Sequence, residues 1–354
     1  MYSNPPFVGA SRAVVVPKEN AESLLRNLLM AHLVDRTMKT VKRGDTILIP
    51  VTAEPHFDLA PFRARLEPHL DLPNRCTPRD PRLEIRDRLM AADIPLEHVP
   101  RRWERIGDVL VIRLPSEGQS SARAIAEIFG RVLGARTVVQ DRSGIHGPLR
   151  LPDVRVLWGD GTETVHTEGG IRYAMDVARV MFSSGNLAER VGIAERVRPG
   201  AVVVDLFAGI GYFSLPIAVR GRADTVYGCE LNPISFRYLV QNTRLNRATN
   251  LVPLLGDCRV VAPRGIADWV IMGHFDARDY LDVAFDALRR NGTIVYHELC
   301  PKEQYPDAMT RRLAATARAH WMHIQAIQTR IVKSYAPGIV HSAAQVEVIR
   351  QNRP

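Results

Sequence analysis

The spacing of apolar and polar positions changes repeatedly along the second half of this chain. Over residues 166–354, short apolar runs that predict strands are separated by segments with the spacing of amphipathic helices. Strands that alternate with helices are typical of a parallel sheet with helices on both faces. We therefore expect an α/β domain here. Its strands are predicted at residues 201–209, 225–231, 251–259, 267–273 and 292–298, and its helices at residues 213–221, 233–246 and 279–291.

The N-terminal part of the chain predicts a small α/β module over residues 1–80. Apolar runs at residues 12–18 and 45–51 indicate strands, and the leucine spacing within residues 20–34 indicates a helix. Asn20 is a suitable N-cap for that helix because its side chain can accept from a free backbone amide. The module is thus expected to pair strands with one covering helix.

A second module of the α+β type is expected over residues 81–165. Residues 71–89 are rich in arginine and proline, which predicts a linker before it. Residues 142–150 read as a basic, glycine-rich loop. The remaining segments predict strands at residues 107–115 and 135–141, a helix at residues 120–134 that Ser120 or Ser121 begins, and a hairpin at residues 162–177.

Composition adds an expectation about the partner. The formal net charge is +9 and the pI about 9.7, which favours a polyanion such as nucleic acid, although a basic protein without such a partner has the same balance. No apolar run has the length of a membrane helix, and the first residues lack a signal-peptide core, so we expect a cytoplasmic protein. Neither a zinc site nor a disulfide framework is predicted, because no CxxC pair occurs. The cysteines are Cys76, Cys229, Cys258 and Cys300.

The strongest chemical motif follows the first strand of the α/β domain. In VVVDLFAGIGYFSLPIA, an apolar strand ends at Asp205, and Gly209 and Gly211 make a tight turn before a helix. Glycines at this place let the backbone approach a ligand at the carboxyl ends of the strands. The spacing lacks the third glycine of dinucleotide-binding proteins, so a pyrophosphate ligand is disfavoured. A purely structural turn is the alternative.

Acidic residues follow the next two predicted strands. Glu230 is suitably placed to accept both hydroxyls of a ribose, and a surface glutamate is the alternative. Asp257 can accept from an adenine amino group and the Cys258 amide can donate to a ring nitrogen, although a turn aspartate has the same appearance. Together with the glycine turn, these residues predict a site for an adenosine without a phosphate chain, and S-adenosylmethionine is such a cofactor.

Three stretches resemble the family of position-37 tRNA modification enzymes of archaea and eukaryotes. They are MFSSGNLAERV at residues 181–191, DLFAGIGYFSLPIAV at 205–219 and IVKSYAPGIVH at 331–341. That family contains guanosine N1-methyltransferases and wyosine-pathway aminocarboxypropyltransferases. The resemblance spans about residues 95–350, and the N-terminal module also resembles the extra domain of archaeal members. It implies a class I S-adenosylmethionine-dependent, Rossmann-like domain preceded by smaller α+β modules.

Two stretches favour the aminocarboxypropyltransferase branch. The methyltransferases carry Asn-Pro-Pro or Asn-Leu-Pro after the fourth strand, whereas this chain has Met272-Gly273-His274-Phe275. Ser184-Gly185-Asn186 also departs from the methyltransferase pattern of Phe-x-Pro-Arg. We interpret Gly273 as leaving room for a tricyclic base and for a cofactor turned to offer a different carbon. The transferred group would then be 3-amino-3-carboxypropyl, with C7 of 4-demethylwyosine in tRNA(Phe) as the acceptor and methylthioadenosine as the product.

The resemblance also implies roles for individual residues. Ser183 and Arg190 would hold the methionine portion of the cofactor, and a guanidinium suits a carboxylate because it binds in a bidentate fork. A surface arginine is the alternative for Arg190. Glu189 matches a carboxylate proposed as the base in the methyltransferase branch, with a salt bridge as its alternative. His274 is a second candidate base, with a role in shape or hydrogen bonding as the alternative.

Other bases and the RNA contacts stay open at this point. His297 and Glu298 lie near a strand end and are further candidate bases, and the reactivity of the cofactor could make a strong base unnecessary. The partner implied is the anticodon loop of tRNA(Phe), bound mostly through phosphates and shape with a splayed base in the pocket. No metal, membrane or obligate protein partner is expected. The candidate RNA-contacting residues are Arg142, His146, Arg150, Lys333 and Tyr335, of which Tyr335 could stack on a base or simply pack.

Two rival functions remain. One is a methyltransferase that acts on the same guanosine or on a wyosine precursor, which the missing Asn-Pro pair disfavours. The other is an RNA-binding protein with a degenerate cofactor fold, which the intact set of glycine and acidic residues disfavours.

Overall fold

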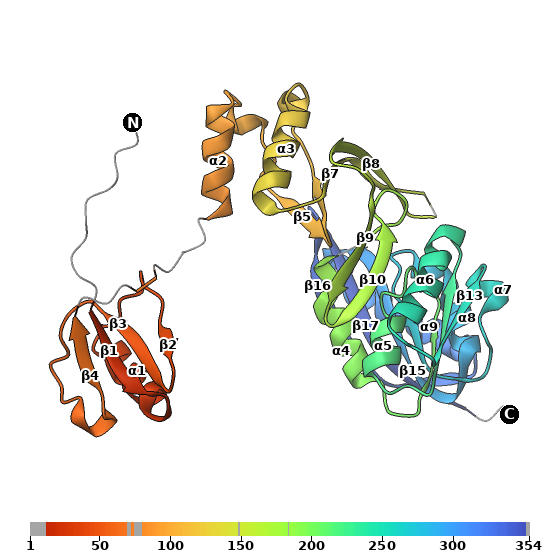
Figure 1. The fold of residues 1–354 in the computed structure, drawn as a ribbon. Coiled ribbons are helices and arrows are strands. Elements are labelled where there is room, and N and C mark those ends of the chain that lie inside the picture. The colour runs from red at the N-terminus through yellow and green to blue at the C-terminus, as the bar shows by residue number, and fades with distance from the viewer. Residues whose placement is uncertain (1–11, 69–71, 74–79, 148, 183, 352–354) are drawn as a thin grey trace. The chain divides into compact units, whose positions relative to one another are not determined.

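The computed structural model describes residues 12–68, 72–73, 80–147, 149–182 and 184–351. Its contacts divide the chain into two compact units, residues 1–84 and residues 85–354, which are described separately (Figure 1).

In its described residues, the first unit is a four-stranded antiparallel sheet packed against helix α1. The strand order is β2-β3-β1-β4. Leu24 and Leu28 of the helix are fully buried and belong to the same core as Val14 of the sheet, so the predicted helix and strands are confirmed. Asn20 precedes the helix, but its side-chain amide donates to the Phe62 carbonyl (3.1 Å) and does not cap the helix. The elements are β1 (Arg12–Pro17), η1 (Lys18–Asn20), α1 (Ala21–Met30), β2 (Val41–Arg43), β3 (Thr46–Val51), η2 (Ala60–Phe62) and β4 (Arg65–Pro68).

The linker prediction for residues 71–89 is wrong from Pro81 onward, because helix α2 spans Pro81–Ala91. Proline is tolerated in the first turn of a helix, where its missing N–H has no partner to lose. Ile85 and Leu89, four residues apart on one face, are buried against the α3 side chain Ile125. The many charges hid this short apolar stripe. Cys76 and the rest of residues 74–79 lie outside the described residues.

The second unit begins with a four-stranded sheet of order β5-β6-β7-β8, against which α3 packs. The basic loop predicted at residues 142–150 is largely strand, because β7 continues through His146. A bulge between Asp141 and Ile145 interrupts the pairing, and the Asp141 carboxylate accepts from the Gly144 amide (2.7 Å). Ser121 begins α3 without a side-chain cap. The elements are η3 (Leu96–His98), β5 (Trp103–Ile106), β6 (Val109–Ile112), η4 (Ser116–Gln119), α3 (Ala122–Leu133), β7 (Thr137–His146) and β8 (Leu151–Trp158).

A seven-stranded sheet follows in this unit, in the order β13-β12-β11-β14-β15-β17-β16, together with a separate two-stranded hairpin. The first five strands are parallel, as predicted, whereas β17 is antiparallel to both of its neighbours. The predicted hairpin is confirmed as β9 (Glu163–Glu168) and β10 (Ile171–Asp176). The strands are β11 (Val202–Asp205), β12 (Thr225–Glu230), β13 (Leu251–Leu255), β14 (Ala267–Met272), β15 (Leu288–Pro301), β16 (Met322–Ala336) and β17 (Ile339–Arg350).

Helices cover both faces of this sheet (Figure 1). Successive residues of β11 point to opposite faces, so Val203 belongs to the core beneath α4, α5 and α6, and Val204 to the core beneath α8 and α9. No helix within the described ranges is long and apolar enough to span a membrane. The helical elements are η5 (Ser184–Asn186), α4 (Leu187–Arg196), α5 (Ser214–Arg220), α6 (Pro233–Leu245), α7 (Cys258–Val261), η6 (Ala277–Tyr280), α8 (Leu281–Ala287), η7 (Lys302–Gln304) and α9 (Asp307–Ala319).

Candidate active site

A cavity of about 560 Å³ lies at the carboxyl ends of the parallel strands, where the strand order reverses between β11 and β14. Open α/β sheets bind ligands at such a reversal, because the loops of the two neighbouring strands diverge there. The β7–β8 segment supplies another part of the wall. Residues of the wall that the sequence did not single out include Phe207, Leu231, Tyr280 and Glu104.

The glycine turn and the acidic end of β12 are joined in the cavity wall. The Glu230 carboxylate accepts from the amides of Gly209 and Asn232, each at 2.7 Å. Burial raises the pKa of Glu230 to about 7, although the two amides oppose this shift. Gly209 has φ +59°, and a Cβ there would lie 2.4 Å from the Tyr212 ring, so the turn requires glycine. A carboxylate has further acceptor sites, so Glu230 can still receive ribose hydroxyls.

Asp205 and Gly211 stabilise this turn through hydrogen bonds outside the cavity wall. Asp205 is fully buried outside the cavity wall and accepts from Ser214 Oγ (2.6 Å) and from the Phe207 amide (3.2 Å). Burial raises its pKa to about 6. Gly211 also lies outside the wall, and its amide donates to the Ala208 carbonyl (2.8 Å). The prediction that both residues bind the cofactor is therefore corrected to a structural role.

Asp257 and Cys258 stand at the start of the short helix α7, in the cavity wall. Cys258 is the first residue of α7, so its amide is among the donors that a helix leaves without an internal partner. Asp257 accepts from the Arg259 amide (2.9 Å) and forms an ion pair with its guanidinium (2.5 Å). Hydrogen bonding to Arg259 lowers the pKa of Asp257, so this carboxylate stays ionised, and both of its oxygens accept from the Arg259 side chain.

Aromatic rings form one side of the cavity. Phe207 lies against His274 (centroids 5.2 Å, planes 30° apart) and meets Tyr280 edge-on at 5.2 Å. Flat apolar surfaces of this kind suit a purine ring. The sequence motif contained Phe207, but nothing in its spacing indicated that this residue would line the cavity.

His274 has a defined hydrogen-bonding state. Its Nδ1 accepts from the Asp276 amide (3.1 Å), so a neutral ring carries its proton on Nε2. Burial lowers the pKa of His274, and the charge of Arg150 lowers it further against the opposing effect of Asp276. The neutral ring can therefore donate from Nε2 but cannot accept a proton there. This geometry favours the hydrogen-bonding alternative for His274 over the role of base.

Gly273 lines the cavity, but the volume that a side chain would take there is filled by the protein, so the interpretation that the missing side chain leaves room for substrate is not supported. A Cβ at this position would lie 2.4 Å from Cε2 and 2.8 Å from Cδ2 of Phe213. The Phe213 side chain is buried and packs against the His297 ring, with centroids 5.7 Å apart. Glycine is thus needed because the protein itself fills the adjoining volume.

Glu189 and Arg190 are both occupied by ion pairs and lie outside the cavity wall. Arg330 holds Glu189 through two hydrogen bonds, one of them 2.8 Å long. Burial alone would raise the pKa of Glu189, but Arg330 outweighs it and the pKa is lowered, which makes a poor base. The Arg190 guanidinium pairs with Glu168 (2.7 Å) and is nearly buried. The roles predicted for Glu189 as base and Arg190 as clamp are therefore not supported by this geometry.

The RNA candidates divide into two groups. Arg150, Lys333 and Tyr335 line the cavity, whereas Arg142 pairs with Asp153 on the neighbouring strand, outside the cavity wall. Arg150 lies over the Phe275 ring at 5.4 Å, and the same ring contacts Tyr335 edge-on at 5.4 Å. Lys333 Nζ donates to Asn186 Oδ1 (3.2 Å). Ser183 and the side chain of His146 lie outside the described residues.

His297 and Glu298 are buried away from the cavity wall. His297 Nδ1 lies 3.0 Å from His341 Nε2, and burial lowers the pKa of His297 to about 3 and that of His341 to about 4. Glu298 accepts from the Tyr296 hydroxyl (2.7 Å) and from Arg312 (2.5 Å). Neither residue is placed to act as a base on a ligand in the cavity, so both candidacies are corrected.

The parallel sheet, the glycine turn and the acidic strand ends define a class I S-adenosylmethionine-dependent transferase. Family models match as the TRM5/TYW2 methyltransferase domain over residues 164–325, the TYW2 N-terminal domain over residues 85–162 and the tRNA methyltransferase 5 N-terminal domain over residues 13–57. The chain belongs to the TRM5/TYW2 family.

Curated relatives come from both branches. A tRNA(Phe) (4-demethylwyosine(37)-C(7)) aminocarboxypropyltransferase of Pyrococcus horikoshii is 35% identical over 74% of this chain and 95% of its own. The enzyme of the same name from Methanocaldococcus jannaschii is 36% identical over 68% of this chain and 95% of its own. The tRNA (guanine(37)-N(1))-methyltransferase Trm5b of Pyrococcus abyssi is 31% identical over 92% of this chain and 95% of its own.

Solved structures from both branches of the family are also similar to this chain. The P. horikoshii TYW2 structure in complex with MeSAdo has a TM-score of 0.68 at 34% identity and covers 75% of this chain and 98% of that one. The P. abyssi Trm5b structure has a TM-score of 0.69 at 28% identity and covers 96% of this chain and 99% of that one.

Glu230 gives the site a pH dependence. Its pKa of about 7 means that the carboxylate is ionised above this pH and protonated below it. Hydroxyl groups donate more strongly to the ionised form. We expect the affinity for methylthioadenosine, measured by calorimetry, to fall as the pH drops through about 7. Glu230→Gln should bind about 10- to 100-fold more weakly at high pH and show little pH dependence. A wild-type affinity that stays constant with pH would contradict this role.

The contact between Gly273 and Phe213 predicts a coupled pair. Gly273→Ala should destabilise the protein by about 1–3 kcal/mol in urea unfolding because the buried ring must move. In a Phe213→Leu background the same change should cost less, since the clashing ring atoms are gone. Gly192→Ala is the control, because a Cβ there meets only the flexible end of Arg196. Equal costs of Gly273→Ala in both backgrounds would show that Phe213 is not the constraint.

Proposed function

We propose that this chain transfers the 3-amino-3-carboxypropyl group of S-adenosylmethionine to C7 of 4-demethylwyosine at position 37 of tRNA(Phe). The observation that carries the choice of branch is the loop after β14, where Gly273 packs against Phe213 in place of an Asn-Pro pair. The archaeal relatives named for this reaction support the same choice. The net charge of +9 suits an RNA substrate.

The donor set of the cavity fits an adenosine. Glu230 would accept from the ribose hydroxyls, Asp257 from the adenine amino group, and the Cys258 amide would donate to a ring nitrogen. Phe207 and Leu231 supply apolar surface beside these polar groups. Such a wall, largely apolar with a few convergent polar atoms, is typical of cofactor sites.

The methionine end requires a cation for its carboxylate. In the described part of the cavity wall, the arginine and lysine side chains are Arg150 and Lys333. Arg190 is held by Glu168 behind the wall, so it would act through charge rather than by direct contact in this geometry. We therefore assign the carboxylate to Lys333, and leave Arg150, which lies over Phe275 with Tyr335 beside it, to the base and its phosphate.

S-adenosylmethionine supplies an electrophilic carbon: as the bond from C7 to the γ-carbon of the side chain forms, the bond from that carbon to sulfur breaks and methylthioadenosine leaves. The residues of this chain decide which of the three sulfonium carbons faces the base, because proximity and orientation set the product. His274, with its proton on Nε2, would donate a hydrogen bond to the incoming base. The C7 proton leaves in the same reaction and passes to solvent water, because none of the ion-paired or deeply buried candidate bases is placed to accept it.

The rivals are weaker on these grounds. A methyltransferase of this family is expected to keep the Asn-Pro pair, and a pure RNA-binding protein has no need of Glu230, Asp257 and the glycine turn in one wall. The cysteines in the described ranges, Cys229, Cys258 and Cys300, are free thiols, which supports our assignment to the reducing cytoplasm.

A double-label assay tests the reaction. Precursor tRNA is incubated with the protein and with S-adenosylmethionine labelled either on the methyl carbon or on the carboxyl carbon. We expect the carboxyl label in the tRNA and the methyl label in released methylthioadenosine. Methyl label in the tRNA would establish the methyltransferase rival, and label in neither tRNA nor methylthioadenosine, with tRNA bound but no cofactor bound, would favour the RNA-binding protein.

The assignment of His274 as a donor predicts a difference between two variants. His274→Gln retains an N–H donor near the position of Nε2, whereas His274→Leu retains only bulk. We expect the leucine variant to lose about 10- to 100-fold in transfer rate and the glutamine variant to lose much less. At saturating S-adenosylmethionine, where the pH dependence of binding through Glu230 no longer limits the rate, kcat should not rise through an ordinary histidine titration between about pH 6 and about pH 8 in the wild type, since burial lowers the pKa of His274. Equal losses in both variants would point to a base instead.

A further inference from the structure

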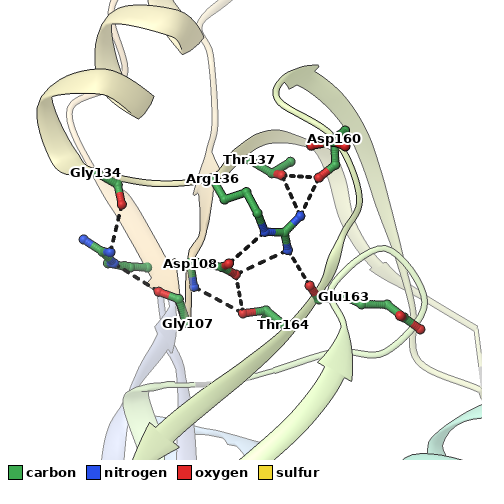
Figure 2. A network of polar contacts seen from close by, with 9 residues as sticks. Gly107, Asp108, Gly134, Arg136, Thr137, Asp160, Glu163 and Thr164 are labelled. Atoms are coloured by element: carbon green, nitrogen blue, oxygen red, sulfur yellow. Dashed lines mark hydrogen bonds and ion pairs between the residues drawn. The ribbon is translucent and has the colours of Figure 1, made fainter.

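The connection between the two C-terminal family domains is held by a dense polar network. The match to the TYW2 N-terminal domain ends at residue 162 and the match to the methyltransferase domain begins at residue 164. Figure 2 shows the guanidinium of Arg136, which directly precedes β7, between Asp108 on one side and Asp160 and Glu163 of this connection on the other. The boundary between two domains is therefore pinned by side chains and is not a free linker.

Arg136 supplies the larger part of the network. Its Nη1 donates to the Asp160 carbonyl (2.5 Å), and its Nη2 donates to the Glu163 carbonyl (2.6 Å). Its Nε donates to Asp108 Oδ2 (2.7 Å). A guanidinium is planar, so three partners in these directions fix its plane and its position together. The backbone on both sides of residue 162 is thus tied to one rigid group.

Asp108 completes the link to the methyltransferase domain. The Thr164 hydroxyl donates to Asp108 Oδ1 (2.7 Å), and the Asp108 amide donates to the hydroxyl oxygen of Thr164 (3.2 Å). A Cβ on Gly107 would lie 2.1 Å from that hydroxyl, so the β5–β6 turn approaches β9 as closely as glycine allows. The Gly107 amide donates to His166 Nδ1 (3.1 Å), and His166 lies two residues beyond Thr164 on the same face of β9.

These bonds lie near the surface, which bears on their role. The side chains of Arg136 and Asp108 are 40% and 47% exposed. Ion pairs with this exposure contribute little to the free energy of unfolding, because water screens them. The hydrogen bonds from Arg136 to backbone carbonyls still fix the orientation of the backbone at residues 160 and 163 relative to β7. The network is therefore better suited to setting the angle between two domains than to stabilising either one.

The active-site cavity depends on that angle. We call residues 160–164, which connect the two domains, the joint. Glu104, Asp141 and Arg150 of the cavity wall come from the segment before the joint, and Glu230 and His274 come from the segment after it. The strands β5 and β7, which carry Glu104 and Asp141, begin or end beside the network itself. A change of angle at the joint would move one half of the wall relative to the other.

We propose that Arg136, with Asp108 and Thr164, is a positioning residue. It holds the cavity-wall residues that precede the joint, such as Arg150, in register with those that follow it, such as Glu230. This inference rests on the proposed transfer to tRNA. The adenosine-binding groups all follow the joint in the chain, so cofactor binding does not require it. Transfer does require it, because a misplacement of about 1 Å between reacting groups is enough to cost two orders of magnitude in rate.

Three arginine variants test the proposal in the full chain. Arg136→Met removes every donor, and Arg136→Lys keeps the charge but loses the planar fork. Arg131→Met, which breaks an exposed pair with Glu127 on α3, is the matched control. The measurements are the Kd for methylthioadenosine by calorimetry and kcat for incorporation of carboxyl label into precursor tRNA. We expect Arg136→Met and Arg136→Lys to lower kcat at least tenfold with the Kd within about threefold of wild type, and Arg131→Met to change neither.

Two results would overturn the proposal. One is a kcat of Arg136→Met within threefold of wild type, which would make the network incidental. The other is a parallel loss of methylthioadenosine affinity, which would make it a support of the fold. Thr164→Ser, which keeps the hydroxyl, should retain activity that Thr164→Val loses.

Hydrogen exchange separates this proposal from the proposed function. If wild-type protein transfers no label, the proposed function fails, but the joint is still testable. The amides of residues 160–164 should exchange faster in Arg136→Met than in wild type, while those of the central strands β11 and β14 remain unchanged. Unchanged exchange at residues 160–164 would overturn the joint irrespective of the reaction.

Discussion

The active site depends on one half-buried carboxylate. Glu230 accepts from the Gly209 amide on one side and from the Asn232 amide on the other, and so joins the turn after β11 to the start of α6. Asn232 continues the chain of contacts, because its side chain caps α6 and also donates to the Leu149 carbonyl (3.0 Å) in the β7–β8 turn. The turn after β11 and the β7–β8 part of the cavity wall are thereby connected through Glu230 and Asn232.

The same carboxylate combines two roles that conflict. Burial makes its charge costly, which is why its pKa is raised to about 7, yet an ionised oxygen is the better acceptor for a ribose. The two backbone amides reduce the cost of the charge without filling every acceptor site. An acid at this place can therefore hold a ligand's hydroxyls only because the glycine turn brings an amide to within hydrogen-bonding distance.

Patterns that depend on neighbours in the sequence were predictable, and contacts between distant elements were not. The strands, the glycine turn and Glu230 follow from periodicity and spacing, which the backbone obeys locally. The ion pairs of Arg190 with Glu168 and of Glu189 with Arg330 join residues that are 22 and 141 positions apart, so no local signal revealed them. Gly273 is the clearest example: its absent side chain suggested an opening for substrate, and the buried Phe213 ring occupies that space.

The order of strands in the large sheet has a consequence for how the protein is made. β17 lies between β15 and β16, although it follows both in the chain. While the chain emerges from the ribosome, β15 therefore presents an unpaired edge and β16 has no strand to join until residues 339–350 are available. Lys333 and Tyr335 stand on β16 in the cavity wall, so the wall closes only when synthesis has passed β17. A nascent chain can thus complete its glycine turn well before the cavity wall is closed, and the exposed edge of β15 is the surface that needs protection from wrong partners during that interval.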